Sequence, residues 1–289
     1  FIEERTEGFE ELRENLKKFP PEKVSQITGV PLELLVEAAR LYASHEKAAI
    51  FYTLGITEHV CGTDNVRSLA NLAMLTGHLG KESSGVNPLR GQNNVQGSCD
   101  MGALPNVFTG YQSVTNPEAQ EKFEKAWGVK LSSKVGYMIP DMFDSAVKKE
   151  LRAMYIMGED PVLTDADANH VRKGLQALDF LVVQNIFMSE TAKLADVILP
   201  GASFAEKDGT FTNTERRVQR VRRAIKPIGN AKADWEIICE LSNRMGYPMN
   251  YQSPAEIMDE IASLTPQYAG ISYERLGNKG LQWPVPHKD

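Results

Sequence analysis

Cysteine is scarce in this chain of 289 residues. The three cysteines, Cys61, Cys99 and Cys239, lie far apart and form no CxxC motif. Structural zinc sites and iron–sulfur clusters use closely grouped cysteine and histidine ligands, and a disulfide framework needs an even number of cysteines. We therefore expect no metal site made by the chain's own residues. We expect three small buried thiols in a reducing compartment.

Long apolar runs and an excess of positive charge are also lacking. No segment approaches the ~18 consecutive apolar residues that a membrane span needs. There are 32 Lys and Arg residues against 38 Asp and Glu residues, for a net charge of −6. A nonspecific nucleic-acid-binding face needs a basic surplus. The sequence therefore predicts no membrane span and no nucleic-acid partner, and it leaves open a small anionic ligand in a local positive pocket.

The chain opens on "FIEERTEGFEEL", without an initiator methionine or a signal peptide. We expect it to be a piece of a longer protein, with any targeting sequence upstream, and we expect that protein to be cytoplasmic. The chain has 42% hydrophobic and 24% charged residues, which is ordinary for a globular protein. At ~150 residues per domain, the length predicts about two domains.

Helical and extended patterns alternate along the chain. The expected strands are 48–54, 153–157, 180–184 and 196–199. The first, "AAIFYTL", is apolar on both faces, as in a buried parallel strand. A helix follows, with Thr63 or Asp64 as its cap and Gly80 after its end. The alternation predicts an α/β fold of two α/β lobes with mostly parallel sheets. We assign residues 1–90 to the end of one α/β domain and residues 91–289 to most of a second.

Glycine, carboxylate and amide residues follow two of the later strands directly. They are Gly158, Glu159, Asp160, Gln184 and Asn185. In open α/β sheets, ligands bind beyond the carboxyl ends of the strands. Glycine lets a ligand approach the backbone, and Gln and Asn offer a donor and an acceptor to a base edge. This pattern predicts a Rossmann-like dinucleotide-binding topology without the GxGxxG fingerprint. The alternative is a simple turn in which Asp160 caps a helix.

The segment "NPLRGQNNVQGSCDMGALPN", residues 87–106, is rich in amides and glycines and holds one arginine, Arg90. An arginine in such a loop typically holds a carboxylate or phosphate in a fork of N–H donors. The alternative is a surface arginine that pairs with a nearby acid. Two interpretations are also open for the basic run from Arg216 to Arg223, which can be a solvated hairpin or one wall of a cleft. The sequence leaves both a structural and a ligand-binding role possible for His59.

These segments together resemble the catalytic subunits of molybdenum- or tungsten-dependent formate dehydrogenases, within the molybdopterin (DMSO reductase) oxidoreductases. The resemblance rests first on "NPLRGQNNVQGSCDMG". It extends through "YTLGITEHVCGTDNVRSLANLAMLTGHLGK", "YIMGEDPVLTDAD", "VVQNIFMSETAKLADVILPGASFAEKDGTFTNTERRVQR" and "DWEIICELSNRMGYPM" in the same order and spacing. It runs essentially from Phe1 to Asp289, and it implies the middle part of such a subunit.

The resemblance implies roles for individual residues. Arg90 matches the residue at the formate site, and Gln92 matches one near a pterin. The segment from Gly55 to His59 resembles one that faces the cofactor. Residues matching the guanosine contacts of two molybdopterin guanine dinucleotides are Gly158, Glu159, Asp160, Thr164, Gln184, Asn185 and Asp234. Two residues depart from the pattern, since Glu58 stands where relatives often have Gln and Gly201 where a relative can have Ser.

The resemblance also implies what lies outside this chain. The family's 4Fe–4S cluster is bound by an N-terminal cysteine motif, the Cys or selenocysteine ligand of the metal also precedes this region, and a C-terminal domain covers the cofactors. We therefore expect the chain alone to be inactive and without cofactor. In the longer enzyme we expect formate and CO2 as substrate and product, a bis-molybdopterin guanine dinucleotide centre with Mo or W, and electron-transfer subunits or domains. The alternatives are another molybdopterin enzyme, such as a nitrate reductase, and an inactive structural relative in a respiratory complex.

Overall fold

The computed structural model describes residues 2–288. The chain divides into two compact units, Phe1–Gly91 and Gln92–Asp289. This division falls one residue from the boundary expected at 90 and 91, and the assignment of the units to evolutionary domains stays a prediction. Within residues 2–288, no helix combines the length and the apolar character that a membrane crossing requires.

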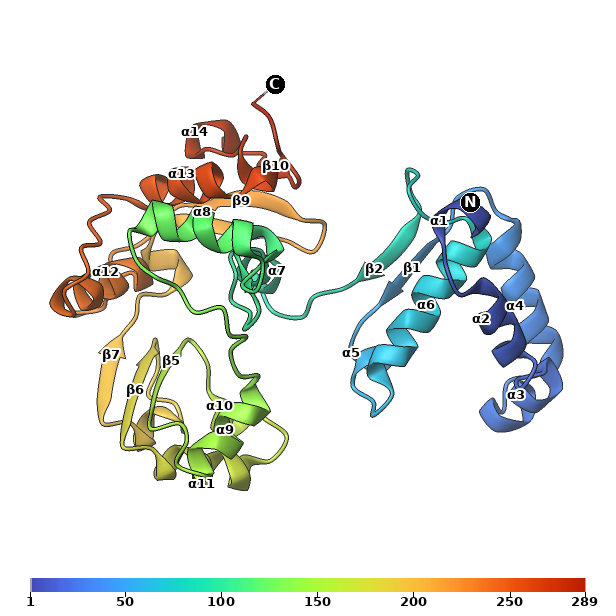
Figure 1. Ribbon diagram of the computed structural model, residues 1–289, viewed down its shortest axis with the longest axis horizontal. Helices are drawn as coiled ribbons and strands as arrows, with labels where there is room; N and C mark the ends of the chain where they lie inside the picture. The colour runs from blue at the N-terminus through green and yellow to red at the C-terminus, as the bar shows by residue number, and fades with distance from the viewer. Residues whose placement is uncertain (1, 289) are drawn as a thin grey trace. The chain divides into compact units, whose positions relative to one another are not determined.

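Unit 1 is a two-stranded parallel sheet with helices. Strand β1 (Ala49–Tyr52) pairs with β2 (Gly85–Pro88) from Ala49 opposite Gly85 to Tyr52 opposite Pro88. The connection between them contains the long helix α6, as Figure 1 shows. The helices are α1 (Ile2–Arg5), α2 (Phe9–Leu16), α3 (Pro21–Thr28), α4 (Leu32–Ser44), α5 (Leu54–Thr57) and α6 (Gly62–Thr76). The amide-rich segment 87–106 therefore begins inside a strand.

Three details of unit 1 differ from the sequence prediction. Strand β1 is not buried on both faces, because β2 is its only paired strand in the described chain and Phe51 is 65% exposed. Neither Thr63 nor Asp64 caps α6, since the helix already begins at Gly62. The helix ends at Gly77, with φ at 71°, where the N–H reaches the carbonyls of Ala73 and Met74. That left-handed turn ends the helix three residues before Gly80.

Unit 2 is built around a parallel sheet of order β5-β6-β7. The strands are β5 (Ala153–Met157), β6 (Phe180–Asn185) and β7 (Val197–Pro200), so the three parallel strands predicted here are confirmed. Helices α9 (Ile139–Val147), α10 (Pro161–Thr164) and α11 (Ala168–Ala177) complete the βαβ part. Side chains of the sheet, of these helices and of the 3-10 helix Ala192–Leu194 form one core: Phe143, Ile156, Val162, Val171, Leu175, Leu181, Val183 and Ala192. The opposite face of the sheet is partly open, with Tyr155 and Met157 exposed.

A second layer of unit 2 is antiparallel (Figure 1). Strands β8 (Gly209–Thr212), β9 (Arg217–Val221) and β10 (Leu281–Gln282) form one sheet, and β3 (Val107–Phe108) pairs with β4 (Gln112–Ser113). The basic run thus lies in a hairpin. The helices are α7 (Val95–Asp100), α8 (Pro117–Trp127), α12 (Asp234–Arg244), α13 (Pro254–Leu264) and α14 (Tyr273–Leu276). A second core contains Val218, Met258, Tyr268, Ile271 and Leu276. The α/β class is confirmed, and antiparallel pairing is added to it.

Candidate functional site

The carboxyl ends of β5, β6 and β7 meet at one edge of the sheet in unit 2. In the parallel register Met157 is opposite Gln184, and Gln184 is opposite Leu199. The N–H of Gly158 donates to the carbonyl of Gln184 at 2.9 Å, and the N–H of Gly201 donates to that of Asn185 at 3.1 Å. These bonds place two glycine turns on either side of the end of β6. The strand-tip residues singled out by the sequence are therefore neighbours.

Gln184, which is buried, and Asp234, which is half-buried, lie next to each other at this edge. Gln184 is 1% exposed, and its Nε2 donates to Oδ1 of Asp234 at 2.5 Å. The hydroxyl of Tyr155 donates to Oε1 of Gln184, and Lys207 forms an ion pair with the other oxygen of Asp234. Burial raises the pKa of Tyr155, and the charge of Asp234 adds to the rise. Phenol, amide, carboxylate and ammonium groups are thus fixed side by side on residues from four places in the sequence.

Gly201 shapes the same edge by its small size. A Cβ atom at this position would lie 3.3 Å from Oδ1 of Asp234 and 3.6 Å from Cγ of Gln184. The first distance is shorter than a comfortable carbon–oxygen contact, so a side chain here would press on the carboxylate. The departure from serine noted in the sequence therefore lets Asp234 lie close to the backbone.

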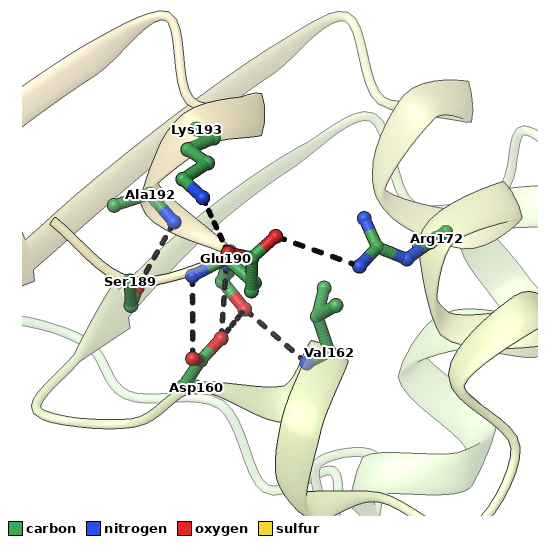
Figure 2. A network of polar contacts seen from close by, with 8 residues as sticks. Asp160, Val162, Arg172, Ser189, Glu190, Ala192 and Lys193 are labelled. Atoms are coloured by element: carbon green, nitrogen blue, oxygen red, sulfur yellow. Dashed lines mark hydrogen bonds and ion pairs between the residues drawn. The ribbon is translucent and has the colours of Figure 1, made fainter.

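Asp160 joins the loop after β5 to the loop after β6 (Figure 2). Its carboxylate accepts hydrogen bonds from the backbone N–H and hydroxyl of Thr191, at 2.9 and 2.5 Å, and from the N–H of Glu190 at 3.3 Å. Burial opposes ionisation, but these bonds and the charge of Arg172 outweigh it and lower the pKa of Asp160. The residue precedes α10, yet its side chain makes no cap bond. The capping alternative is therefore wrong for the side chain, and the role in cofactor binding stays a prediction.

Glu159, Thr164 and Asn185 lie on the accessible side of the edge. The hydroxyl of Thr164 donates to Oε1 of Glu159 at 2.8 Å, and Nδ2 of Asn185 donates to the Glu159 carbonyl at 3.4 Å. Glu159 and Thr164 are exposed. Ile186 and Phe187 follow directly and are 51% and 76% exposed. Exposed apolar side chains next to polar groups suit a planar ligand with an apolar face and a polar edge.

The candidates in unit 1 and at the junction are accessible. Nε2 of His59 lies 2.9 Å from the carbonyl oxygen of Gly55, which joins the two ends of this predicted cofactor-facing segment. Glu58, Arg90 and Gln92 are exposed. Within residues 2–288, Arg90 forms no ion pair, so its pairing with a nearby acid is not observed there. Its guanidinium is available to an anion.

Sequence reasoning missed Tyr155, Thr191 and Lys207. Thr191 is fully buried, and its hydroxyl also accepts the N–H of Val162 at 3.2 Å. The short segment "SETAK" gave no sign of this role, since the partners lie about 30 residues upstream. The buried-thiol prediction is wrong for Cys61, which is exposed at the start of α6, and holds for Cys239. Cys99 is only half-buried.

A cavity of about 730 Å³ lies elsewhere in unit 2, between α8, α12 and α13. Its walls include Trp127, Trp235, Tyr247, Tyr251 and Glu260. None of the predicted site residues lines it. A smaller cavity of about 240 Å³ includes Lys207 and Asp234. Only the smaller cavity is connected to the candidate site.

A model of the family described as molybdopterin oxidoreductase matches residues 14–244, most of the chain. The chain belongs to this family. It is 54% identical over 98% of its length to F420-dependent formate dehydrogenase 2 subunit alpha of Methanococcus maripaludis, covering 42% of that protein. It is 50% identical over 98% of its length to formate dehydrogenase H of Escherichia coli, covering 40% of it. The chain thus spans about two fifths of the length of these relatives.

A solved structure supports the fold. Acetylene hydratase from Pelobacter acetylenicus superposes with a TM-score of 0.72 at 20% sequence identity, over 98% of this chain and 41% of that one. At such low identity the likeness shows the fold alone. The resemblance found in the sequence is therefore confirmed by the family model and by the similarity to formate dehydrogenase subunits.

Membership of this family implies a molybdopterin cofactor with Mo or W. The residues at the sheet edge fit the nucleotide end of such a group. Asp234 can accept from N–H donors, Gln184 holds it in place through the bond from Nε2 to Oδ1, and the absence of a side chain at Gly201 leaves the carboxylate close to the strand. The left-handed turn at Gly158, with φ at 69°, leaves backbone without a side chain beside Glu159.

Proposed function

We propose that the longer protein containing this chain is the catalytic subunit of a formate dehydrogenase, which oxidises formate to CO2 and catalyses the reverse reaction. The observation that carries the proposal is the 50–54% identity to formate dehydrogenase subunits over 98% of the chain. That range includes both the Arg90 segment and the sheet edge of unit 2. The bound Mo or W centre, held by two molybdopterin guanine dinucleotides, would accept the two electrons of formate.

In this proposal the sheet edge of unit 2 binds a guanosine. Asp234 accepts from the N–H groups of the base, and Gln184 fixes the orientation of Asp234 through their 2.5 Å hydrogen bond. Glu159, Thr164 and Asn185 are accessible to the ribose. The position of Asp160 makes it a support for this surface, because its carboxylate already accepts three protein hydrogen bonds.

Arg90 binds the substrate anion in this proposal. Its exposed guanidinium has no ion-pair partner in the described chain, and its planar N–H fork matches a carboxylate. By holding formate in one orientation, the arginine removes rotational freedom before reaction and stabilises negative charge in a dry site. Gln92 would contact the pterin, and the segment from Gly55 to His59 would face the cofactor.

The proposal extends to electron transfer, to the compartment of the enzyme and to the state of this chain alone. A 4Fe–4S cluster would carry electrons to other subunits or domains, and the enzyme would be cytoplasmic. The chain alone would carry neither metal nor activity, because the resemblance assigns the metal ligand and part of the cofactor envelope to other parts of such a subunit.

The test is a comparison of dye reduction with formate and of dye oxidation with nitrate by the full-length enzyme, alongside its metal and pterin content. Formate-dependent reduction with bound pterin and metal supports the proposal. Nitrate turnover without formate turnover assigns another molybdopterin activity. A protein that holds no pterin after expression in a cofactor-producing host is the inactive structural relative.

A further inference from the structure

In the amide-rich segment 87–106, the residues that follow Gln92 are attached to the rest of unit 2 by an unusual turn. Asn94 precedes α7 with φ at 66°, a left-handed conformation that Asn tolerates better than most residues. Its Oδ1 accepts the backbone N–H of Thr212, in β8, at 2.9 Å. A Cβ atom on Gly97 would lie 2.1 Å from that same Oδ1. Glycine at 97 therefore makes room for the Asn94 side chain to reach β8.

The other end of α7 is attached through a buried carboxylate. Asp100 is 0% exposed. Its Oδ1 accepts from Nε2 of Gln96 and from the hydroxyl of Tyr111, both at 2.8 Å. Its Oδ2 accepts from the hydroxyl of Tyr268 at 3.2 Å. Each of these three donors is uncharged, and together they satisfy both oxygens of the buried carboxyl group.

These contacts decide where α7 lies, because the helix is too short to be stable by itself. It has six residues, whereas isolated helices below ~12 residues are marginal in water. Burial raises the pKa of Tyr111 to about 12, and the hydrogen bond to Asp100 contributes. The phenol is therefore a hydrogen-bond donor at neutral pH.

We propose that Asn94 and Asp100 are positioning residues that hold Gln92, in the amide-rich segment 87–106, on the rest of unit 2. The carbonyl of Gln92 accepts the N–H of Val95, the first residue of α7, at 3.3 Å. A shift of α7 therefore moves Gln92, which is the first residue of unit 2 and is joined to Arg90 through Gly91. This inference rests on the proposed function, which assigns the anion site to Arg90 and the pterin contact to Gln92.

The two anchors act through geometry and not through charge. Asp100→Asn keeps an oxygen for Gln96 and Tyr111 and places an amide where Oδ2 was, opposite a Tyr268 hydroxyl that can accept as well as donate. Asp100→Ala removes all three bonds. Asn94→Gly keeps the left-handed turn but loses the acceptor of the Thr212 N–H. Asn94→Asp keeps both the left-handed turn and the acceptor.

The test uses the metal-replete full-length enzyme and compares these four variants. We expect Asn94→Gly and Asp100→Ala to lower formate kcat/KM roughly 10- to 100-fold, since misplacement of a binding group by about 1 Å has effects of this size. The conservative variants Asn94→Asp and Asp100→Asn should stay within about threefold of wild type. Hydrogen–deuterium exchange of residues 89–100 should accelerate only in the first two. Trp127→Phe is the matched control, since it removes a 2.9 Å hydrogen bond to Glu260 that involves no residue of this segment.

The outcomes separate the two proposals. Wild-type kcat/KM and wild-type exchange in Asn94→Gly overturn the positioning role, even where Asp100→Ala fails to fold. A control that lowers kcat/KM as much as Asn94→Gly also overturns it, because the effect is then general destabilisation. If the wild-type enzyme oxidises no formate, the proposed function fails, and the exchange of residues 89–100 alone decides the anchoring: acceleration supports it and unchanged exchange overturns it.

Discussion

Asp160 and Thr191 lie 31 residues apart in sequence and are joined by two hydrogen bonds to one carboxylate oxygen. One bond comes from the backbone N–H and the other from the hydroxyl of Thr191, which is fully buried. The pair links the turn after β5 to the turn after β6, where the strand-tip residues gather. Its integrity therefore determines the shape of the surface proposed to bind guanosine.

Thr191→Val should destabilise unit 2. The change keeps the side-chain shape but removes the hydroxyl that donates to Asp160 and accepts from Val162. Hydrogen bonds to charged groups contribute about 1.5–3 kcal/mol, and at ~2–4 °C per kcal/mol the melting temperature should fall by roughly 3–12 °C. Differential scanning calorimetry measures the change. Thr115→Val, at an exposed threonine of the same unit, should shift it by less than ~2 °C, and equal shifts would contradict the assignment.

The Asp160 carboxylate should also make stability depend on acid pH. Its pKa is lowered from the ordinary 3.8 on folding, so the folded state binds the proton less tightly than the unfolded state. The stabilisation is complete above pH 3.8 and is lost as the pH falls through the folded-state pKa. Asp160→Asn should remove this part of the acid dependence. Urea unfolding between about pH 5 and pH 2.5 tests it, and parallel curves for the two proteins would show that Asp160 does not contribute.

Asp234→Asn should weaken retention of the cofactor in the full-length enzyme. The amide no longer offers two acceptor oxygens to a base edge, and a charge-assisted bond of ~1.5–3 kcal/mol is lost, which corresponds to roughly 10- to 100-fold in affinity. The pterin released per protein, measured by fluorescence after oxidation, should fall after dilution and gel filtration. Asp141→Asn, at an exposed position of α9, is the matched control. Equal retention in both variants would remove Asp234 from the site.

The 289-residue chain expressed alone should carry no stoichiometric Mo or W and should not reduce a dye with formate. It spans about two fifths of its relatives, and we propose that the rest of the subunit supplies part of the cofactor contacts. Elemental analysis of the purified chain from a cofactor-producing host measures this. One metal per chain would mean that these residues are sufficient for binding.

The parallel strands of unit 2 were predictable because apolar runs alternate with helical segments and end in glycine, amide and carboxylate residues. Their carboxyl ends must meet in such a sheet, so the closeness of Gly158 and Gln184 followed from topology. The bonding partner of each side chain could not be inferred from the topology. Asp160 pairs with Thr191 and Asp234 with Lys207 through contacts 27 to 31 residues apart, and local sequence patterns carry no information on them.

In unit 1, local sequence patterns likewise did not determine the burial of a strand or the residue at which a helix ends. The composition of β1 correctly indicated a strand, but exposure of Phe51 depends on which strands are its neighbours. Gly77 and Gly80 both have left-handed backbones, and both suit a helix end by residue type. The hydrogen bond from His78 N–H to the Ala73 carbonyl closes the helix at the first of them.

The most direct test of the account is formate kcat/KM of the metal-replete full-length enzyme with Arg90→Ala and Arg90→Lys. We expect Arg90→Ala to lose roughly 10- to 100-fold or more, from charge-assisted bonds of ~1.5–3 kcal/mol each. Arg90→Lys should recover only part, because a point charge does not reproduce a planar fork. Arg67→Ala, at an exposed arginine of unit 1 paired with Asp64, should leave the rate unchanged. Near-wild-type kcat/KM in Arg90→Ala, with full metal and pterin content, would contradict the assignment of the anion site.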